Sequence, residues 1–214
     1  MLHICLILKF SADKTALFLI DKKTFVRYNL DMDKQDLIKT ACFTGYRPEK
    51  FPFKLHNDDV DFVILKSRIF KTLESLIEDD CKIFYCGMAM GFDILCAECV
   101  LELKKIHNDI KLKCAIPFKE QGNSLSFSWR NRYFEILNRC DEFRYISDEY
   151  SKTCYQLRNK FMVDNSDFVI CWYDGKAGGT RNTLRYASKK GRTIININLN
   201  YIDEFNNTQT LIDI

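Results

Sequence analysis

The fold is decided by residues 82–93, which read KIFYCGMAMGFD. The first five of these residues form a short apolar run, which predicts a buried strand. Gly87 and Gly91 then predict a turn, because glycine permits backbone conformations that other residues avoid. Apolar residues at helical spacing continue to residue 106 and predict a helix. A buried strand that leads through a glycine turn into a helix is the repeating unit of a parallel α/β sheet.

The same unit recurs along residues 39–214. Further apolar runs occur at residues 40–44, 111–116, 142–146, 168–172 and 193–199. Segments of helical spacing lie between these runs, so the pattern predicts a Rossmann-like, mostly parallel sheet with helices on both faces. Residues 1–38 differ, because two apolar stretches at residues 4–10 and 15–20 flank a polar turn. We therefore expect a small N-terminal β extension, with the α/β domain beginning at residue 39.

The composition restricts which partners and which cellular compartment we expect for the protein. The chain has 214 residues, with 32 Lys plus Arg against 29 Asp plus Glu, and a formal charge of +3. This charge is too small to indicate nucleic acid or an anionic membrane by itself. No apolar run approaches the roughly 20 residues that span a bilayer, so we expect no membrane partner. Several of the 10 cysteines stand inside apolar runs, as reduced thiols do, and we expect a cytoplasmic protein.

Ligands of parallel α/β sheets bind outside the carboxyl ends of the strands, so the loops after the strands matter most. The first such loop contains Thr44, Gly45 and Arg47. Gly45 allows a sharp exit from the strand, and Pro48 holds Arg47 in an extended conformation. An arginine restrained in this way is a candidate for pairing with an anion. The alternative is a surface arginine on a turn.

The second loop contains Gly87, Met88 and Gly91 and leads into a helix. Its two glycines would let the backbone approach a ligand closely, where the helix N-terminus attracts a phosphate. Asp93 lies in the first helical turn, where a carboxylate would repel phosphate. We therefore expect Asp93 either to cap the helix or to hold a ribose hydroxyl.

The third loop spans residues 173–180 and contains Asp174, Gly178, Gly179 and Thr180. Two glycines and a threonine at a helix start are typical of an anion-binding nest, which offers backbone amides and a hydroxyl without obstruction. The alternative is a flexible connection capped by Thr180. Because a second glycine turn stands at an equivalent strand end, we favour ligand binding.

Other residues could complete such a site. Arg158 and Asn159 lie on the predicted helix before the strand at 168–172, where Arg158 could face a phosphate. Trp129 and Tyr133 stand four residues apart and could stack on a base, although core packing is the commoner role of such a pair. Glu98 and Asp93 are weak candidates for catalysis. A lone C-x-x-C pair, Cys96 and Cys99, and three scattered histidines predict no metal site and no cofactor.

Taken together, the loops resemble the YpsA-like branch of the SLOG superfamily. The matching stretches are residues 44–48, 87–93, 117–129, 158–164 and 178–180. The resemblance implies a Rossmann-like domain over residues 39–214 that binds a nucleotide-derived ligand. YpsA-like proteins usually carry His where Tyr46 stands here, so a role that needs an imidazole at this position is in doubt.

The wider superfamily contains enzymes, DNA-binding proteins and sensors, and these give three hypotheses. We favour a sensor or regulatory protein that binds a nucleotide-derived or ADP-ribose-like phosphate compound, as a small-molecule partner. The first alternative is a nucleoside monophosphate phosphoribohydrolase of the LOG type. Arg158 and Met162 keep that type's spacing, but Thr183 stands where LOG enzymes carry the glutamate that glycosidic cleavage requires. This departure favours binding over catalysis.

The second alternative is single-stranded DNA binding of the DprA type. The net charge of +3 is small, and no basic cluster with interleaved aromatic residues is visible along the sequence. Nucleic acid is therefore the least favoured partner at this point. A homo-oligomer stays open, because relatives commonly pair through their helices.

Overall fold

The computed structural model describes residues 15–21, 24–29, 38–198 and 208–209. The chain divides between Ile38 and Lys39 into two compact units. The first unit contains a two-stranded antiparallel sheet of β1 (Thr15–Asp21) and β2 (Thr24–Asn29). The predicted N-terminal β extension is thus confirmed, but its pairing joins β1 to β2, with Phe18 opposite Val26. The apolar stretch at residues 4–10 lies outside the described residues.

The second unit is built on a seven-stranded sheet in which every pairing is parallel. Its order is β6-β5-β4-β3-β7-β8-β9. The strands are β3 (Lys39–Thr44), β4 (Cys81–Cys86), β5 (Lys111–Ile116), β6 (Glu142–Tyr145), β7 (Phe168–Cys171), β8 (Thr193–Asn196) and β9 (Thr208–Gln209). Six of these strands coincide with the predicted apolar runs. The Rossmann-like architecture expected from the sequence is confirmed.

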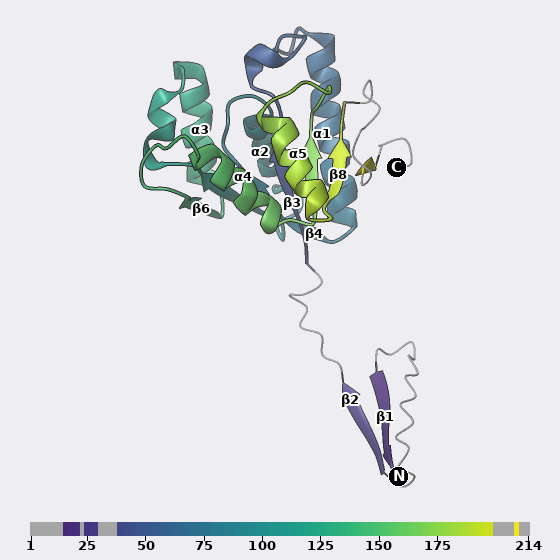
Figure 1. Cartoon of the computed structure of the whole chain (residues 1–214). Helices are drawn as coiled ribbons and strands as arrows, with labels where there is room; N and C mark the ends of the chain where they lie inside the picture. Colours follow the sequence, from purple (N-terminus) through teal and green to yellow (C-terminus); the bar gives the residue numbers. More distant parts are fainter. Residues whose placement is uncertain (1–14, 22–23, 30–37, 199–207, 210–214) are drawn as a thin grey trace. The chain divides into compact units, whose positions relative to one another are not determined.

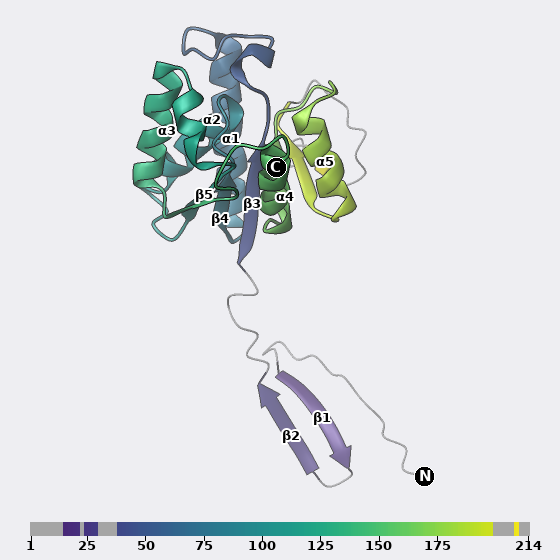
Figure 2. The same cartoon turned by 60° about the vertical axis from the view of Figure 1, so that its left-hand side comes forward.

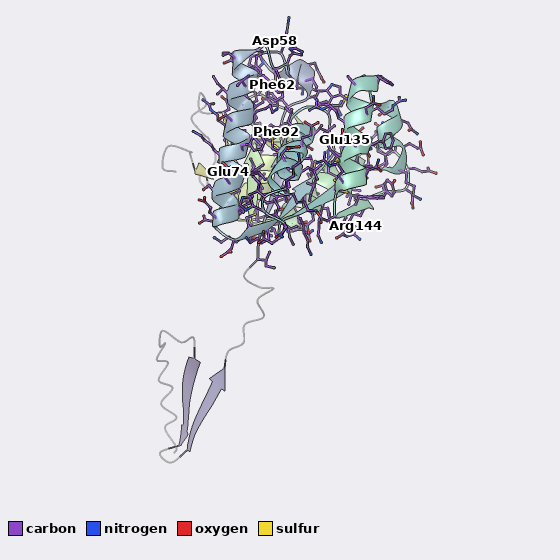
Figure 3. The ribbon with its side chains drawn as sticks, turned by 180° about the vertical axis from the view of Figure 1, so that it is seen from behind. Asp58, Phe62, Glu74, Phe92, Glu135 and Arg144 are labelled. Carbon is purple, nitrogen blue, oxygen red and sulfur yellow. The ribbon has the colours of Figure 1, made fainter. Side chains whose placement is uncertain are left out.

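Helices cover both faces of this sheet (Figures 1 and 2). They are α1 (Val60–Glu78), α2 (Phe92–Leu103), α3 (Phe127–Arg139), α4 (Cys154–Asp164) and α5 (Gly179–Lys189). Helices α1, α2 and α3 pack in a row on one face, which Figure 3 shows with Phe62 on α1, Phe92 on α2 and Glu135 on α3. Helices α4 and α5 pack against each other on the opposite face. The crossover from β6 to β7 therefore changes the side of the sheet.

The core lies between the central strands and α2. Residues 41–43 of β3 are completely buried, because the strand has neighbours on both sides and helices on both faces. Helix α2 is buried almost all round, including Cys96 and Cys99 of the C-x-x-C pair, as expected for a helix that is apolar on every face. The outermost strand β6, by contrast, is exposed along its whole length. None of the helices in the described ranges is long and apolar enough to cross a bilayer.

The strand order fixes where a ligand can bind. Strands β3 and β7 are neighbours in the sheet, and the connection after β3 runs to β4 on one side whereas the connection after β7 runs to β8 on the other. At such a reversal the loops after the two adjacent strands separate and leave a crevice at their carboxyl ends. In this chain those are the loops after β3 and β7, which include residues 44–47 and 174–180. Both were singled out from the sequence as ligand loops.

Candidate functional site

A cavity of about 560 Å³ opens at the reversal point of the sheet. One wall is the loop after β3 together with Lys50 of the short 3-10 helix η2 (Pro48–Lys50). The loop after β7 and the first turn of α5 form the opposite wall. Helix α4 contributes Tyr155, Arg158 and Asn159. Cavities of this size accommodate a nucleotide-sized molecule.

The inner end of the cavity holds a buried ion pair. Arg158 Nη1 lies 3.5 Å from Asp93 Oδ2, and each side chain is only 6% exposed. The same guanidinium donates a hydrogen bond to the Gly87 carbonyl oxygen. Burial raises the pKa of Asp93 to about 6, although Arg158 and the Ala89 N–H oppose this shift. The Nε of Arg158 is buried without a hydrogen-bond partner.

The glycine turn at residues 87–91 is closed by packing. A Cβ on Gly87 would overlap the Arg158 guanidinium, and one on Gly91 would overlap the Tyr46 carbonyl oxygen. Gly91 has a φ of +92°, and the next residue, Phe92, donates its N–H to that same carbonyl at 3.1 Å. Within this turn only Ala89 lines the cavity. The two glycines therefore serve close packing, whereas the sequence analysis expected an open cradle for an anion.

The glycine turn at residues 178–180, by contrast, lies open to the cavity. Gly178, Gly179 and Thr180 all line it, and a Cβ on Gly179 would meet nothing within 4 Å. Helix α5 begins here without a side-chain hydrogen bond to cap it. The first turn of an α-helix leaves N–H groups without intrahelical acceptors and carries partial positive charge. Thr180 Oγ1 donates to the Gly45 carbonyl oxygen at 3.0 Å and joins the two walls.

Basic side chains surround this turn. Arg47, Lys50 and Lys176 line the cavity and are exposed to solvent. The Arg47 guanidinium lies 5.9 Å from the centroid of the Tyr155 ring. Among the described residues that line the cavity, Asp93 is the acidic one, and it is paired with Arg158. The site is therefore positively charged and suited to an anion.

Tyr46 and Asp174 connect the two loops through their side chains. The Tyr46 hydroxyl donates to Asp174 Oδ1, and its ring packs against Trp172 with centroids 5.1 Å apart. Burial and the Asp174 carboxylate raise the pKa of Tyr46, so the hydroxyl stays protonated. Asp174 also accepts a hydrogen bond from Lys176 Nζ at 2.7 Å. Asp174 does not line the cavity, contrary to its predicted contact with ligand, because these bonds hold it against the loops.

Most of the predicted ligand-binding residues lie around the cavity, and the others lie outside it. Those that line the cavity are Thr44, Gly45, Arg47, Asp93, Arg158, Asn159, Gly178, Gly179 and Thr180. Gly87, Gly91 and the completely buried Met88 lie behind it. Sequence reasoning missed Tyr46, Lys50, Ala89, Tyr155, Lys176 and Ala177 as lining residues. Tyr155 could have been found, since it precedes Arg158 by three residues and so shares its helix face.

The remaining candidates do not line the cavity and have structural roles of their own. Glu98 forms a bidentate ion pair with Arg132, at 2.6 and 2.7 Å, and the Arg132 guanidinium lies 4.2 Å from the Trp129 ring centroid. Tyr133 is buried in the core. Thr183, at the position of the LOG glutamate, donates its hydroxyl to the Gly179 carbonyl oxygen at 2.9 Å. Glu98, Trp129 and Tyr133 are not lining residues of the cavity.

Comparison with known proteins identifies relatives of this chain. The family model for YpsA, described as the YspA SLOG family, matches residues 41–206. The SPbeta prophage-derived protein YoqJ of Bacillus subtilis is 36% identical over 138 residues, which cover 58% of this chain and 81% of that protein. A UPF0398 protein of Bacillus thuringiensis is 28% identical over 179 residues, which cover 82% of this chain and 96% of that protein.

Two solved structures share the fold. One is DNA processing protein A from Helicobacter pylori, with a TM-score of 0.56 and 19% identity over 85% of this chain and 79% of that one. The other is DprA from Streptococcus pneumoniae, with a TM-score of 0.51 and 16% identity over 74% of this chain and 50% of that one. At these identities the similarity shows the fold alone.

These structures overturn one expectation from the sequence. The Helicobacter pylori structure is described by its single-stranded DNA binding mode. Ranking nucleic acid as the least favoured partner was therefore wrong. The physical reason is that the net charge of +3 sums over the whole chain, whereas a nucleic acid responds to the local charge of the surface that it contacts.

Proposed function

This chain belongs to the YspA SLOG family, and on that premise we propose that its cavity binds a nucleotide unit of single-stranded DNA through the phosphate. The open first turn of α5 carries the proposal. Gly178, Gly179 and Thr180 line the cavity at a helix N-terminus that has no side-chain cap. Backbone amides at such a terminus are suited to phosphate oxygens.

The surrounding charges support the same ligand. Arg47 and Lys50 add positive side chains around the turn, and Arg158 lines the buried end of the cavity. Arginine pairs with phosphate oxygens through donors in a fixed geometry, and lysine adds mobile positive charge. The Tyr155 ring lies beside Arg47 and gives a base an aromatic face on which to stack.

The similarity in fold to the DNA-processing proteins supports DNA as the source of the nucleotide. A free nucleotide or an ADP-ribose-like compound, the ligand favoured from the sequence, presents the same phosphate chemistry. The two sources are separated by equilibrium binding with fluorescently labelled oligothymidylate, competed by thymidine 5′-monophosphate or by inorganic phosphate. We expect the oligonucleotide to bind and the monophosphate to compete weakly. Competition by the monophosphate at equal or lower concentration than unlabelled oligonucleotide would assign the cavity to a free nucleotide.

Replacing Arg47 with Ala tests the charge around the cavity. An exposed guanidinium paired with a phosphate contributes roughly 1 kcal/mol, so we expect about a fivefold loss of oligonucleotide affinity. Arg139→Ala is the control, because Arg139 is exposed on α3 and contacts Glu135 instead of the cavity. Equal affinities for the two variants would exclude Arg47 from the binding site.

A further inference from the structure

A second cavity of about 580 Å³ lies between α4 and α5. Tyr155, Asn159 and Gly179 line this cavity and also the first one, so the two cavities are adjacent. We call the second cavity the α4–α5 groove. Because it starts beside the first turn of α5 and follows both helices, a ligand anchored by its phosphate at that turn has a path along the surface. None of the sequence motifs pointed to this groove.

The α4–α5 groove is strongly basic. Lys152 and Lys160 line it from the α4 side, and Arg185 and Lys189 line it from α5. All four side chains are exposed, and no Asp or Glu is among the described residues that line the groove. Within the part of the chain that the structure describes, none of the four forms an ion pair. A surface of this kind attracts a chain of negative charges.

Aromatic rings accompany these charges. Tyr155 stands where the groove meets the first cavity, and Tyr186 lines it on α5. Both rings are partly exposed, and Lys160 Nζ lies 5.7 Å from the centroid of the Tyr186 ring. Surfaces that bind single-stranded nucleic acids combine cations for the phosphates with aromatic rings for the bases. Acidic side chains of a peptide would use the cations but carry no aromatic rings to stack on the two tyrosines.

We propose that the α4–α5 groove holds the continuation of a single strand of DNA whose first nucleotide occupies the cavity. The inference rests on the proposed function and extends it, because it makes the ligand an oligonucleotide that spans two adjacent sites. Each of the two cavities has the volume of a nucleotide-sized ligand, so filling both requires more than one nucleotide. The affinity therefore rises with oligonucleotide length until the groove is filled.

The test reverses charge in the groove and leaves the cavity intact. Arg185→Glu combined with Lys189→Glu changes two exposed groove residues that do not line the first cavity. Lys71→Glu combined with Lys111→Glu makes the same change in net charge at exposed positions of α1 and β5, outside both sites. Binding of oligothymidylates of increasing length, of thymidine 5′-monophosphate and of polyglutamate is measured for both double variants and the unchanged protein.

We expect the groove variant to lose oligothymidylate affinity by at least about tenfold and to keep its affinity for the monophosphate. The slope of log affinity against log salt concentration should become shallower by about 1.4, which corresponds to two phosphate contacts of a single strand. The control variant should bind every ligand as the unchanged protein does.

Three results would overturn the inference. They are an unchanged oligothymidylate affinity of the groove variant, an affinity independent of oligonucleotide length, and competition by polyglutamate as strong as by oligothymidylate. With any of these three results, a loss of oligothymidylate binding in the Gly179→Asp variant would still support the proposed function of the cavity. Loss of oligothymidylate binding in the groove variant but not in Gly179→Asp would support the groove and contradict the cavity. Absence of binding to the unchanged protein would contradict both.

Discussion

Replacing Gly179 with Asp is expected to lower the affinity for oligothymidylate by at least about thirtyfold, because a carboxylate then occupies the place of the phosphate. Two like charges about 4 Å apart repel by about 4 kcal/mol at a protein surface, before screening by salt. The fold should survive, since a Cβ on Gly179 meets nothing within 4 Å and its φ lies outside the left-handed region. An acidic residue in the first turn of α5 also favours the helix.

Gly179→Asn is the matched control, because its side chain has the same shape without the charge. We expect the Asn variant to lose no more than about a third of the binding free energy lost by the Asp variant. Fluorescence anisotropy gives the affinities, and circular dichroism with a thermal melt shows whether each variant is folded. Equal losses in the two variants would mean that bulk, and not charge, excludes the ligand. Unchanged affinity of the Asp variant would place the ligand elsewhere.

Replacing Arg158 with Met is expected to destabilise the protein by about 3–5 kcal/mol, because it leaves a buried carboxylate without its counter-charge. Arg158 lies 3.5 Å from Asp93 and also donates to the Gly87 carbonyl oxygen. Adding Asp93→Asn removes the carboxylate charge that Arg158→Met leaves buried without a partner. We therefore expect the double variant to be more stable than Arg158→Met alone, and urea denaturation measures both.

The stability of the Arg158→Met variant should depend on pH in a defined direction. Burial raises the pKa of Asp93 from 3.8 to about 6, and loss of Arg158 removes a group that opposes this shift. Between 3.8 and the native pKa the folded state holds more protons than the unfolded state, so stability falls as pH rises. Arg158→Met should therefore lose more stability at about pH 8 than at about pH 5. A loss of stability that is the same at both pH values, or larger at the lower one, would contradict the presence of a buried, unpaired Asp93 carboxylate.

The central strands of the sheet could be predicted because they are buried on both faces. Such strands read as continuous apolar runs, and the runs at 40–44 and 111–116 match β3 and β5 within one residue. The short strand β9 was missed, since two residues are too few to show a pattern. In the N-terminal extension, the sequence pointed to a third apolar stretch at residues 25–28, which the structure pairs with β1.

The site could be predicted only in part. The loops after parallel strands lie at one edge of the sheet, so the sequence pointed to the two loops that line the cavity with residues 44–47 and 176–180. The glycine pattern could not distinguish an open turn from a closed one. Gly87 is closed by the side chain of Arg158, which is 71 residues away in sequence. The basic groove was invisible for the same reason, because its cations come from two separate helices and form no run.

Amide chemical shifts test most directly the claim that a phosphate binds at the first turn of α5. Uniformly nitrogen-labelled protein is titrated with oligothymidylate, and the amide signals of Gly178, Gly179 and Thr180 are followed. Gly191, just beyond the opposite end of α5, serves as the internal reference. We predict saturable shifts of the three signals at 178–180, at the concentration that the binding assay gives, with Gly191 unchanged. Saturable shifts elsewhere while these three signals stay in place would contradict the assignment of the site.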